Sequence, residues 1–179
     1  MQNNRLNENL KEFENYGIHT PYFTLCNLNI VGRLVDVIDG DSLSIILPIF
    51  NNYYKYNIRL NGIDTCEMKS KNEETKKKAL KARISILNLV TNENYSENLT
   101  KKEIKNILDK NIILVWVECL EFDKYGRLLA NVYHQFDNLN MKKLENSNSL
   151  SEYLLQNKLA YEYTGKTKLS EQDQIITLN

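Results

Sequence analysis

The sequence has few of the residues that cross-link small folds or break regular structure. Its 179 residues include only 3 cysteines, 2 prolines and 6 glycines. Cys26, Cys66 and Cys119 are widely spaced and form no CxxC pair, which argues against a disulfide framework and against a zinc site. We therefore expect a protein of a reducing compartment.

Long apolar segments are also missing. No run approaches the roughly 18 to 20 apolar residues that a membrane-spanning helix needs, and the first residues, MQNNRLNENLKEF, lack the apolar core of a signal peptide. Internal repeats are absent. From these features we expect an intracellular, cytoplasmic protein without a membrane partner, and we expect it to be a monomer.

The chain has no net charge, because 23 basic and 23 acidic residues cancel. Any attraction for a polyanion therefore has to be local. Residues 69–83 hold seven basic side chains against two acidic ones, an excess of five positive charges. A solvated helix face is the ordinary explanation of such a run. A contact with nucleic acid is the functional one, and both interpretations stay open at this point.

The residues that are present indicate one globular domain. Hydrophobic residues make up 42% of the chain and charged residues 26%, which is enough for a continuous core. Period-two and β-branched segments predict strands, and apolar residues at helical spacing predict helices. The strands are expected at about 29–38, 42–49, 54–60, 112–122 and 127–134, and the helices at about 72–90, inside a polar insertion at 91–110, and between 150 and 159.

Turn and cap residues refine this pattern. Gly40 is expected to supply the permissive backbone that the reversal between the first two strands needs. Ser70 with Glu73, and Thr100 with Glu103, have the spacing of capping boxes at the starts of two helices.

Three strands, a helix, two strands and another helix is the order of an OB-fold. We therefore predict an α+β protein, a five-stranded Greek-key β-barrel with two to three flanking helices. This domain is expected to cover 29–165, after an N-terminal extension at 1–28 and before a loose polar tail at 166–179. The extension should contain a short helix packed on the domain. The apolar side chains of that helix are Leu6, Leu10 and Phe13.

Three short motifs contain the side chains that could bind a cation or a phosphate. They are IDGDS at 38–42, RLNGIDTCE at 59–67 and DKYGR at 123–127. Taken singly, each is what a turn, a cap or a surface ion pair uses. An EF-hand is excluded, because its twelfth position would be Phe50 where glutamate is required. A simple turn does not account for the conjunction of all three on one strand order.

Together with a late YxY pair, these motifs resemble the staphylococcal nuclease family over roughly residues 30–163. The resemblance implies that Ca²⁺ is bound by the carboxylates of Asp41 and Asp64 and by the backbone carbonyl of Thr65. It places Asp39 as an acid outside the direct ligands. Because carboxylate and carbonyl oxygens in a loose site suit Ca²⁺ better than Mg²⁺, the residue types agree with this implication.

The resemblance also assigns the catalytic groups. Arg59 and Arg127 would grip the phosphate, and Glu67 would orient or deprotonate the attacking water. Planar guanidinium groups suit a phosphate that gathers negative charge as water enters. The side chains implied to contact the nucleotide are Lys124, Tyr125, Tyr161 and Tyr163. Two residues depart from the family pattern: Cys66 stands where proline is usual and is expected to loosen its loop, and Lys158 replaces a helix-ending glycine.

We therefore predict a Ca²⁺-dependent nuclease that hydrolyses phosphodiester bonds of DNA and/or RNA with little sequence specificity. As the resemblance implies, it would leave 3′-phosphate and 5′-hydroxyl ends. One alternative is a catalytically silent OB-fold module that binds nucleic acid or a protein partner, and a weaker one is a metal-dependent phosphodiesterase of small nucleotides. The presence of every acid and arginine of the motifs favours the nuclease.

Overall fold

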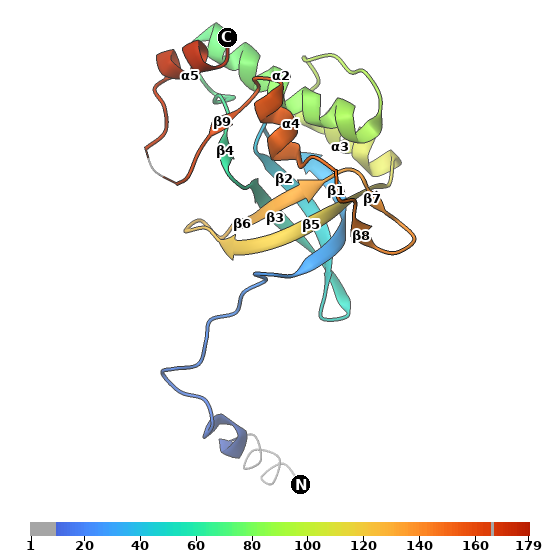
Figure 1. The fold of residues 1–179 in the computed structure, drawn as a ribbon, viewed down its shortest axis with the longest axis vertical. Coiled ribbons are helices and arrows are strands. Elements are labelled where there is room, and N and C mark those ends of the chain that lie inside the picture. The colour runs from blue at the N-terminus through green and yellow to red at the C-terminus, as the bar shows by residue number, and fades with distance from the viewer. Residues whose placement is uncertain (1–9, 166) are drawn as a thin grey trace.

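A closed barrel of five strands forms the centre of the protein, as the computed structural model shows for residues 10–165 and 167–179 (Figure 1). The order around the barrel is β1-β2-β3-β6-β5. Strand β3 pairs with β6 in parallel, and the other four pairs are antiparallel. The predicted α+β OB-type barrel is therefore confirmed. Its strands are β1 (Asn29–Val37), β2 (Ser42–Ile49), β3 (Asn52–Leu60), β5 (Ile113–Phe122) and β6 (Leu128–Tyr133).

Branched apolar side chains fill the barrel. Leu34, Ile45, Ile58, Val117 and Val132 are each 0% exposed, because alternate residues of a strand face the same side of its sheet. The first half of β3 is different. It extends with β2 beyond the barrel as a ribbon, so its tyrosines lie largely in solvent.

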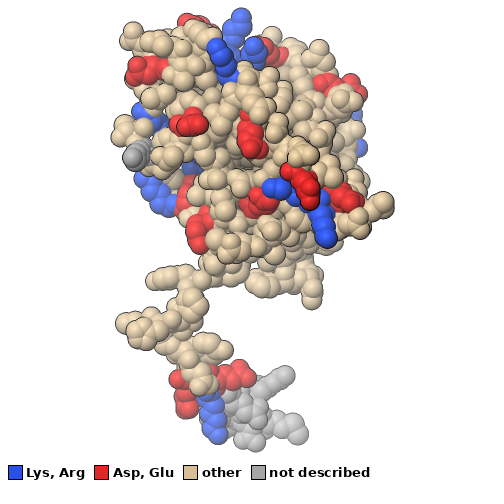
Figure 2. Space-filling view, viewed as in Figure 1, with Lys and Arg blue, Asp and Glu red and all other residues tan. Residues whose placement is uncertain are grey.

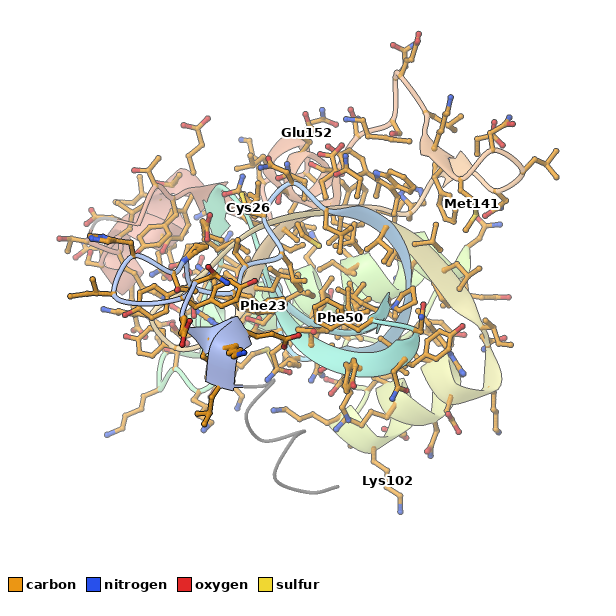
Figure 3. All side chains as sticks on the ribbon, turned by 90° about the horizontal axis from the view of Figure 1, so that it is seen from below. Phe23, Cys26, Phe50, Lys102, Met141 and Glu152 are labelled. Carbon is orange, nitrogen blue, oxygen red and sulfur yellow. The ribbon has the colours of Figure 1, made fainter. Side chains whose placement is uncertain are left out.

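The ribbon turns at Phe50 and Asn51, which both adopt positive φ values, 53° and 59°. The Phe50 ring lies 5.8 Å from that of Phe23 in the N-terminal segment, and Figure 3 labels both side chains. This contact ties the start of the domain to the ribbon.

Helix α2 (Glu73–Thr91) covers one side of the barrel. Its N-cap is Asn72, whose side chain accepts hydrogen bonds from the backbone amides of Glu74 and Thr75 at 2.9 and 3.3 Å. The predicted capping box of Ser70 and Glu73 is therefore wrong. The reason is that asparagine caps a helix as well as serine does, and Asn72 directly precedes the first turn.

The other two predicted helices are present. Helix α3 (Lys101–Lys110) lies in the insertion, and the predicted capping box of Thr100 and Glu103 is confirmed. Helix α4 (Leu150–Gln156) ends two residues before Lys158, whose φ is 55°. A non-glycine residue in this left-handed conformation costs about 1 kcal/mol. No helix of the described residues is long and apolar enough to cross a membrane.

Two small sheets complete the architecture. Strand β7 (Phe136–Asp137) pairs with β8 (Lys142–Lys143) between β6 and α4. Strand β4 (Ile63–Asp64) pairs with β9 (Tyr161–Glu162), with Asp64 opposite Tyr161. This second pairing brings the C-terminal segment to the end of β3, where the motif residues lie.

The C-terminal segment is not the loose tail that we expected. Residues Glu171–Thr177 form helix α5, capped by Ser170, and it contacts α2. Gln174 is 4% exposed and Leu178 is 5% exposed. Short helices of this kind depend on tertiary packing, which a polar sequence pattern does not reveal.

The N-terminal segment, in contrast, packs less closely on the domain than we expected. Residues 10–13 are helical, as predicted, and Leu6 lies outside the described residues. Leu10 and Phe13 are 60% and 70% exposed, and the segment leads away from the barrel in Figure 1. The expected packing of this helix on the domain is therefore wrong.

Gly40 is needed for space and not for a special backbone angle. Its φ is outside the left-handed range, and a Cβ atom there would lie 2.8 Å from the Cβ of Ala82 and 2.9 Å from Cγ2 of Thr65. The turn between β1 and β2 thus packs directly on α2 and on the loop after β4. Our expectation of a permissive turn glycine is corrected accordingly.

This contact predicts the effect of adding one methyl group. Gly40→Ala should lower the free energy of unfolding by about 1–3 kcal/mol, because the added methyl group would overlap the side chains of Ala82 and Thr65. Gly17→Ala is the control, since nothing lies within 4 Å of its would-be Cβ, and we expect a change within about 0.5 kcal/mol. Urea unfolding followed by circular dichroism measures both. Equal stability of the two variants would refute the spatial explanation.

Candidate active site

Six of the eleven predicted site residues line one small pocket of about 120 Å³. They come from the β1–β2 turn, the end of β3, the loop after β4 and the turn before β6. One further lining residue, Lys168, comes from the C-terminal segment. The side chains that line the pocket belong to Asp39, Asp41, Ser42, Arg59, Thr65, Cys66, Glu67, Arg127 and Lys168.

Arg59 holds the site together. Its place in β3 directs it away from the apolar barrel interior, yet it is only 7% exposed. Nη1 forms an ion pair with Oδ2 of Asp41. Nη2 donates to Oδ1 of Asp64 at 2.6 Å and to the carbonyl of Ile63 at 3.1 Å. One guanidinium thus binds carboxylates from two separate loops.

Asp41 lies at the centre of the negative charge. The Ser42 hydroxyl donates to its Oδ1 at 2.9 Å, and the Thr65 amide donates to Oδ2 at 3.3 Å. Burial, together with the nearby charge of Asp39, raises the pKa of Asp41 to about 7 although Arg59 opposes this shift. Asp41 is therefore a buried acid whose charge Arg59 compensates only in part.

Asp64 is held from both sides. Burial alone would favour its neutral form, but hydrogen bonds from Tyr161 and Arg59 keep its pKa below the ordinary value. The Tyr161 hydroxyl donates to Oδ2 at 2.5 Å. Tyr161 is 4% exposed, so in this structure its hydroxyl supports Asp64 from below. Its contact with a nucleotide stays a prediction.

The DKYGR turn presents the second arginine. The carboxylate of Asp123 accepts from the backbone amides of Tyr125 and Arg127 and, at 2.7 Å, from Nε of Arg127. Within the described part of the chain, the two terminal nitrogens of Arg127 have no hydrogen-bond partner. Its guanidinium lies 5.6 Å from the ring of Tyr125, and that of Arg59 lies 5.9 Å from the ring of Tyr163.

Tyr125 is 73% exposed beside the pocket, and Lys124 lies above its ring at 5.1 Å. Lys124, Tyr125 and Tyr163 are therefore positioned around the arginines as the resemblance implies. Their contacts with a nucleotide remain a prediction.

Lys168 is the functional residue that the sequence did not reveal. Its Nζ lies 3.1 Å from Oδ1 of Asp64 and 2.9 Å from Oε1 of Glu67. No local motif marks it, and its segment was expected to be loose. Only the packing of α5 against α2 places this lysine at the pocket.

Cys66 anchors the loop that carries Asp64 and Glu67. Its side chain is 3% exposed and packs with Ala79, Tyr161 and Leu178. Burial raises the pKa of its thiol. The expectation that Cys66 loosens the loop is therefore not met.

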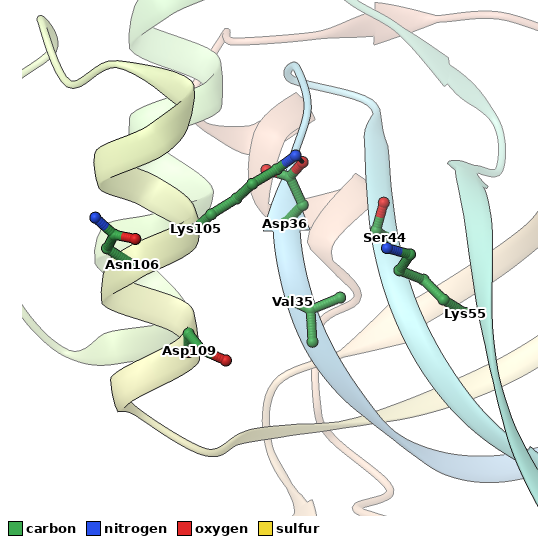
Figure 4. A pocket seen from close by; sticks show the side chains of 7 residues that line it. All are labelled: Val35, Asp36, Ser44, Lys55, Lys105, Asn106 and Asp109. Carbon is green, nitrogen blue, oxygen red and sulfur yellow. Dashed lines mark ion pairs between the residues drawn. The ribbon is translucent and has the colours of Figure 1, made fainter.

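A larger polar pocket of about 300 Å³ lies between α3 and strands β1 and β2 (Figure 4). There Lys105 reaches Oδ2 of Asp36 at 3.2 Å. None of the predicted site residues lines this pocket, so the chemistry of the motifs belongs to the smaller one.

The described residues contain no group of three or more His, Cys, Asp or Glu side chains placed to hold a metal ion. The predicted ligands are two carboxylates and a backbone carbonyl. Their donor atoms are hard oxygens, the atom type that Ca²⁺ prefers, and the carboxylates of Asp41 and Asp64 lie close together because both contact Arg59. Asp41, Asp64 and the carbonyl of Thr65 are the groups that would hold such a cation.

The protein is thus an OB-type barrel with a pocket that gathers two arginines and several acids. A family model described as "Staphylococcal nuclease homologue" matches residues 57–178, which include α5. The chain belongs to this family. Asp39 and Asp41 precede the matched residues, yet the barrel places Asp41 on Arg59. A search of curated proteins found no match to the chain.

The hydrogen bond beneath the site gives a prediction for stability. Tyr161→Phe should lower the free energy of unfolding at pH 7 by about 1–3 kcal/mol, because a buried oxygen of Asp64 loses its donor. The folded pKa of Asp64 is depressed, so this contribution exists above the unfolded pKa of about 3.9 and is lost as the pH falls below it.

Urea unfolding between pH 7 and pH 3 measures this loss, and the difference from the wild type should shrink toward the acid end. Tyr125→Phe provides the control, since its ring is exposed, and should stay within about 0.5 kcal/mol. A constant difference at every pH would argue against a bond to the Asp64 carboxylate.

Proposed function

We propose that this protein is a Ca²⁺-dependent nuclease that hydrolyses phosphodiester bonds of DNA or RNA with little sequence specificity. The observation that carries the proposal is one pocket lined by the guanidinium groups of Arg59 and Arg127 and by the carboxylate of Glu67. The 3′-phosphate and 5′-hydroxyl products follow from the family resemblance. The substrate would be approached without a global field, because Figure 2 shows basic and acidic side chains interspersed on the visible face.

Arg127 is suited to grip a phosphate as the chain stands. Asp123 fixes its Nε, so the guanidinium plane is oriented while the two terminal nitrogens point to no other described residue. A planar pair of donors can bind two phosphate oxygens at once. Its half-buried position strengthens this interaction relative to water.

Arg59 is in a different state, because both terminal nitrogens already bind carboxylates. It becomes available to a phosphate only when Asp41 and Asp64 are neutralised by another positive charge. A bound divalent cation would supply that charge and polarise a phosphoryl oxygen. Arg59 would therefore contact the phosphate in the transition state only when the cation is bound.

Glu67 is placed to act on water. Its side chain is 61% exposed at the pocket rim and lies three residues after Asp64. An exposed carboxylate is a weak base, so we assign Glu67 chiefly the orientation of the attacking water. Lys168 contacts the same carboxylate and keeps it beside the pocket.

Fewer basic side chains of residues 69–83 are exposed for contact with nucleic acid than their number indicated. Arg83 is 3% exposed and donates to the carbonyl of Leu99 at 2.6 Å, so it belongs to the interior. Lys78 binds the carbonyl of Leu178. The exposed lysines available to a nucleic-acid backbone are Lys69, Lys71, Lys77 and Lys81.

One observation favours the catalytically silent alternative. The carboxylates that would hold the cation are already satisfied by Arg59 and Lys168. A silent module would keep these ion pairs permanently and use the surface around Tyr125 for binding alone.

The decisive experiment compares Ca²⁺, Mg²⁺ and chelator in digests of single-stranded DNA, duplex DNA and RNA, followed by end-group analysis. We expect cleavage with Ca²⁺ and none with chelator. Asp41→Asn should lower the rate by about 10² or more, because it removes a charged cation ligand. Asp109→Asn, at an acid whose side chain is 90% exposed, should cut like the wild type. Undiminished cleavage in chelator would rule out the cation, and no cleavage at all would favour the silent module.

A second test concerns the arginines. Arg59→Ala and Arg127→Ala should each lower kcat by about 10²–10³ with a smaller change in KM, because each removes a preorganised donor to the transition state. Lysine at either position should restore little, since it keeps charge without the two-pronged planar contact.

Arg33→Ala is the matched control, because Arg33 pairs with Asp109 away from the pocket. A rise in KM alone would reduce both arginines to substrate binding. A Lys variant at wild-type rate would mean that charge suffices.

A further inference from the structure

We propose that Lys168, which pairs with Asp64 and Glu67, is a built-in counter-cation that competes with the divalent cation for Asp64 and so sets the cation affinity of the site. This inference rests on the proposed cation site, but it does not depend on cleavage of any particular substrate. It assigns a role to the C-terminal segment between β9 and α5.

The first support is the position of the ammonium group. Nζ of Lys168 bridges Oδ1 of Asp64 and Oε1 of Glu67 at 3.1 and 2.9 Å. These acids belong to one loop, and one is a proposed cation ligand while the other is proposed to orient water. The ammonium group thus occupies Oδ1 of Asp64, a carboxylate that a divalent cation would also use.

The second support is that Asp64 has no spare oxygen. Oδ1 binds both Arg59 and Lys168, and Oδ2 accepts the hydroxyl of Tyr161. A cation that binds Oδ1 of Asp64 must displace Arg59 or Lys168. Arg59 is 7% exposed and Tyr161 is 4% exposed, whereas the side chain of Lys168 is 46% exposed. Lys168 is therefore the donor that can leave for solvent.

Release of the Lys168 ammonium group from Asp64 and Glu67 would cost the fold little stability. A half-exposed lysine ion pair contributes little to stability because water screens it and its long side chain regains entropy. The segment that carries it has other anchors. Glu171 accepts from Ser70 at 2.6 Å, and Gln174 donates to the carbonyl of Leu169 at 2.9 Å. The backbone can thus stay in place while the ammonium group moves.

The local charge gives the direction of the effect. Four carboxylates belong to the site, those of Asp39, Asp41, Asp64 and Glu67. Arg127 is paired with Asp123, so without Lys168 the ion pairs that the described residues make with these four acids would come from Arg59 alone. Removing the lysine charge should therefore strengthen cation binding.

Isothermal titration with Ca²⁺ tests this in the full chain. Lys168→Met should bind Ca²⁺ about threefold to fivefold more tightly than the wild type, which is the upper part of the range for a partly exposed ion pair. Lys168→Arg keeps the charge and should bind no more tightly than the wild type. Lys102→Met removes an exposed lysine of α3, labelled in Figure 3, and should leave the affinity unchanged.

A second measurement uses the unmutated side chain. With all lysines ¹³C-dimethylated, which retains their charge, the Lys168 signal should shift on saturation with Ca²⁺. That signal is assigned by its loss in Lys168→Arg. This readout remains decisive even if Lys168→Met folds poorly.

Several outcomes would overturn the proposal. They are equal affinity of Lys168→Met and wild type, an equal gain in Lys102→Met, an unmoved Lys168 signal at saturation, or no Ca²⁺ binding by any variant. Tighter binding in Lys168→Met without cleavage of DNA or RNA would support the competition and sink the nuclease proposal instead. The two proposals therefore fail separately.

Discussion

The structure depends on one buried cation, the guanidinium of Arg59, which joins the β1–β2 turn to the loop after β4. Its partners Asp41 and Asp64 are almost inaccessible to solvent. Removing one partner of a buried ion pair typically costs about 3–5 kcal/mol, because the other charge is left uncompensated. The acids and the arginine are therefore a structural unit as well as the candidate chemical one. A substitution at any of them is expected to affect folding and function together.

The surrounding contacts keep Arg59, Asp41 and Asp64 in place. Gly40 allows the β1–β2 turn to approach α2 and Thr65. The β4–β9 pairing sets Tyr161 beneath Asp64, and Gln174 of α5 lies within 3.4 Å of the Tyr161 hydroxyl. These contacts link residues that are distant in sequence. The C-terminal segment is thus part of the site's support, which agrees with a family match that extends to residue 178.

The barrel and the motif residues could be predicted from the sequence because their signals are local. Strand alternation, the Thr100 and Glu103 cap, and the spacing of IDGDS, RLNGIDTCE and DKYGR each occupy a short stretch of chain. The role of Gly40, the support by Tyr161 and the position of Lys168 could not be predicted. Each arises from a contact between segments far apart, and no local pattern encodes it. Helix α5 is an intermediate case, since Ser170 and Asp173 give a cap signal but the segment has too few apolar residues to indicate packing.

Arg59 and Arg127 differ in whether their terminal nitrogens are already bound, and this difference sets the order in which cation and phosphate are proposed to bind. Arg127 has one acid partner and keeps its terminal nitrogens available among the described residues, whereas both terminal nitrogens of Arg59 are bound by carboxylates. A phosphate that enters the pocket alone would meet Arg127 first, together with the repulsion of the acids. Arg59 can exchange a carboxylate for the phosphate only after Asp41 and Asp64 acquire another counter-charge. On the proposed function, the pocket would couple cation binding to substrate binding through a single shared guanidinium, and hydrolysis without the cation would lack one of its two planar donors.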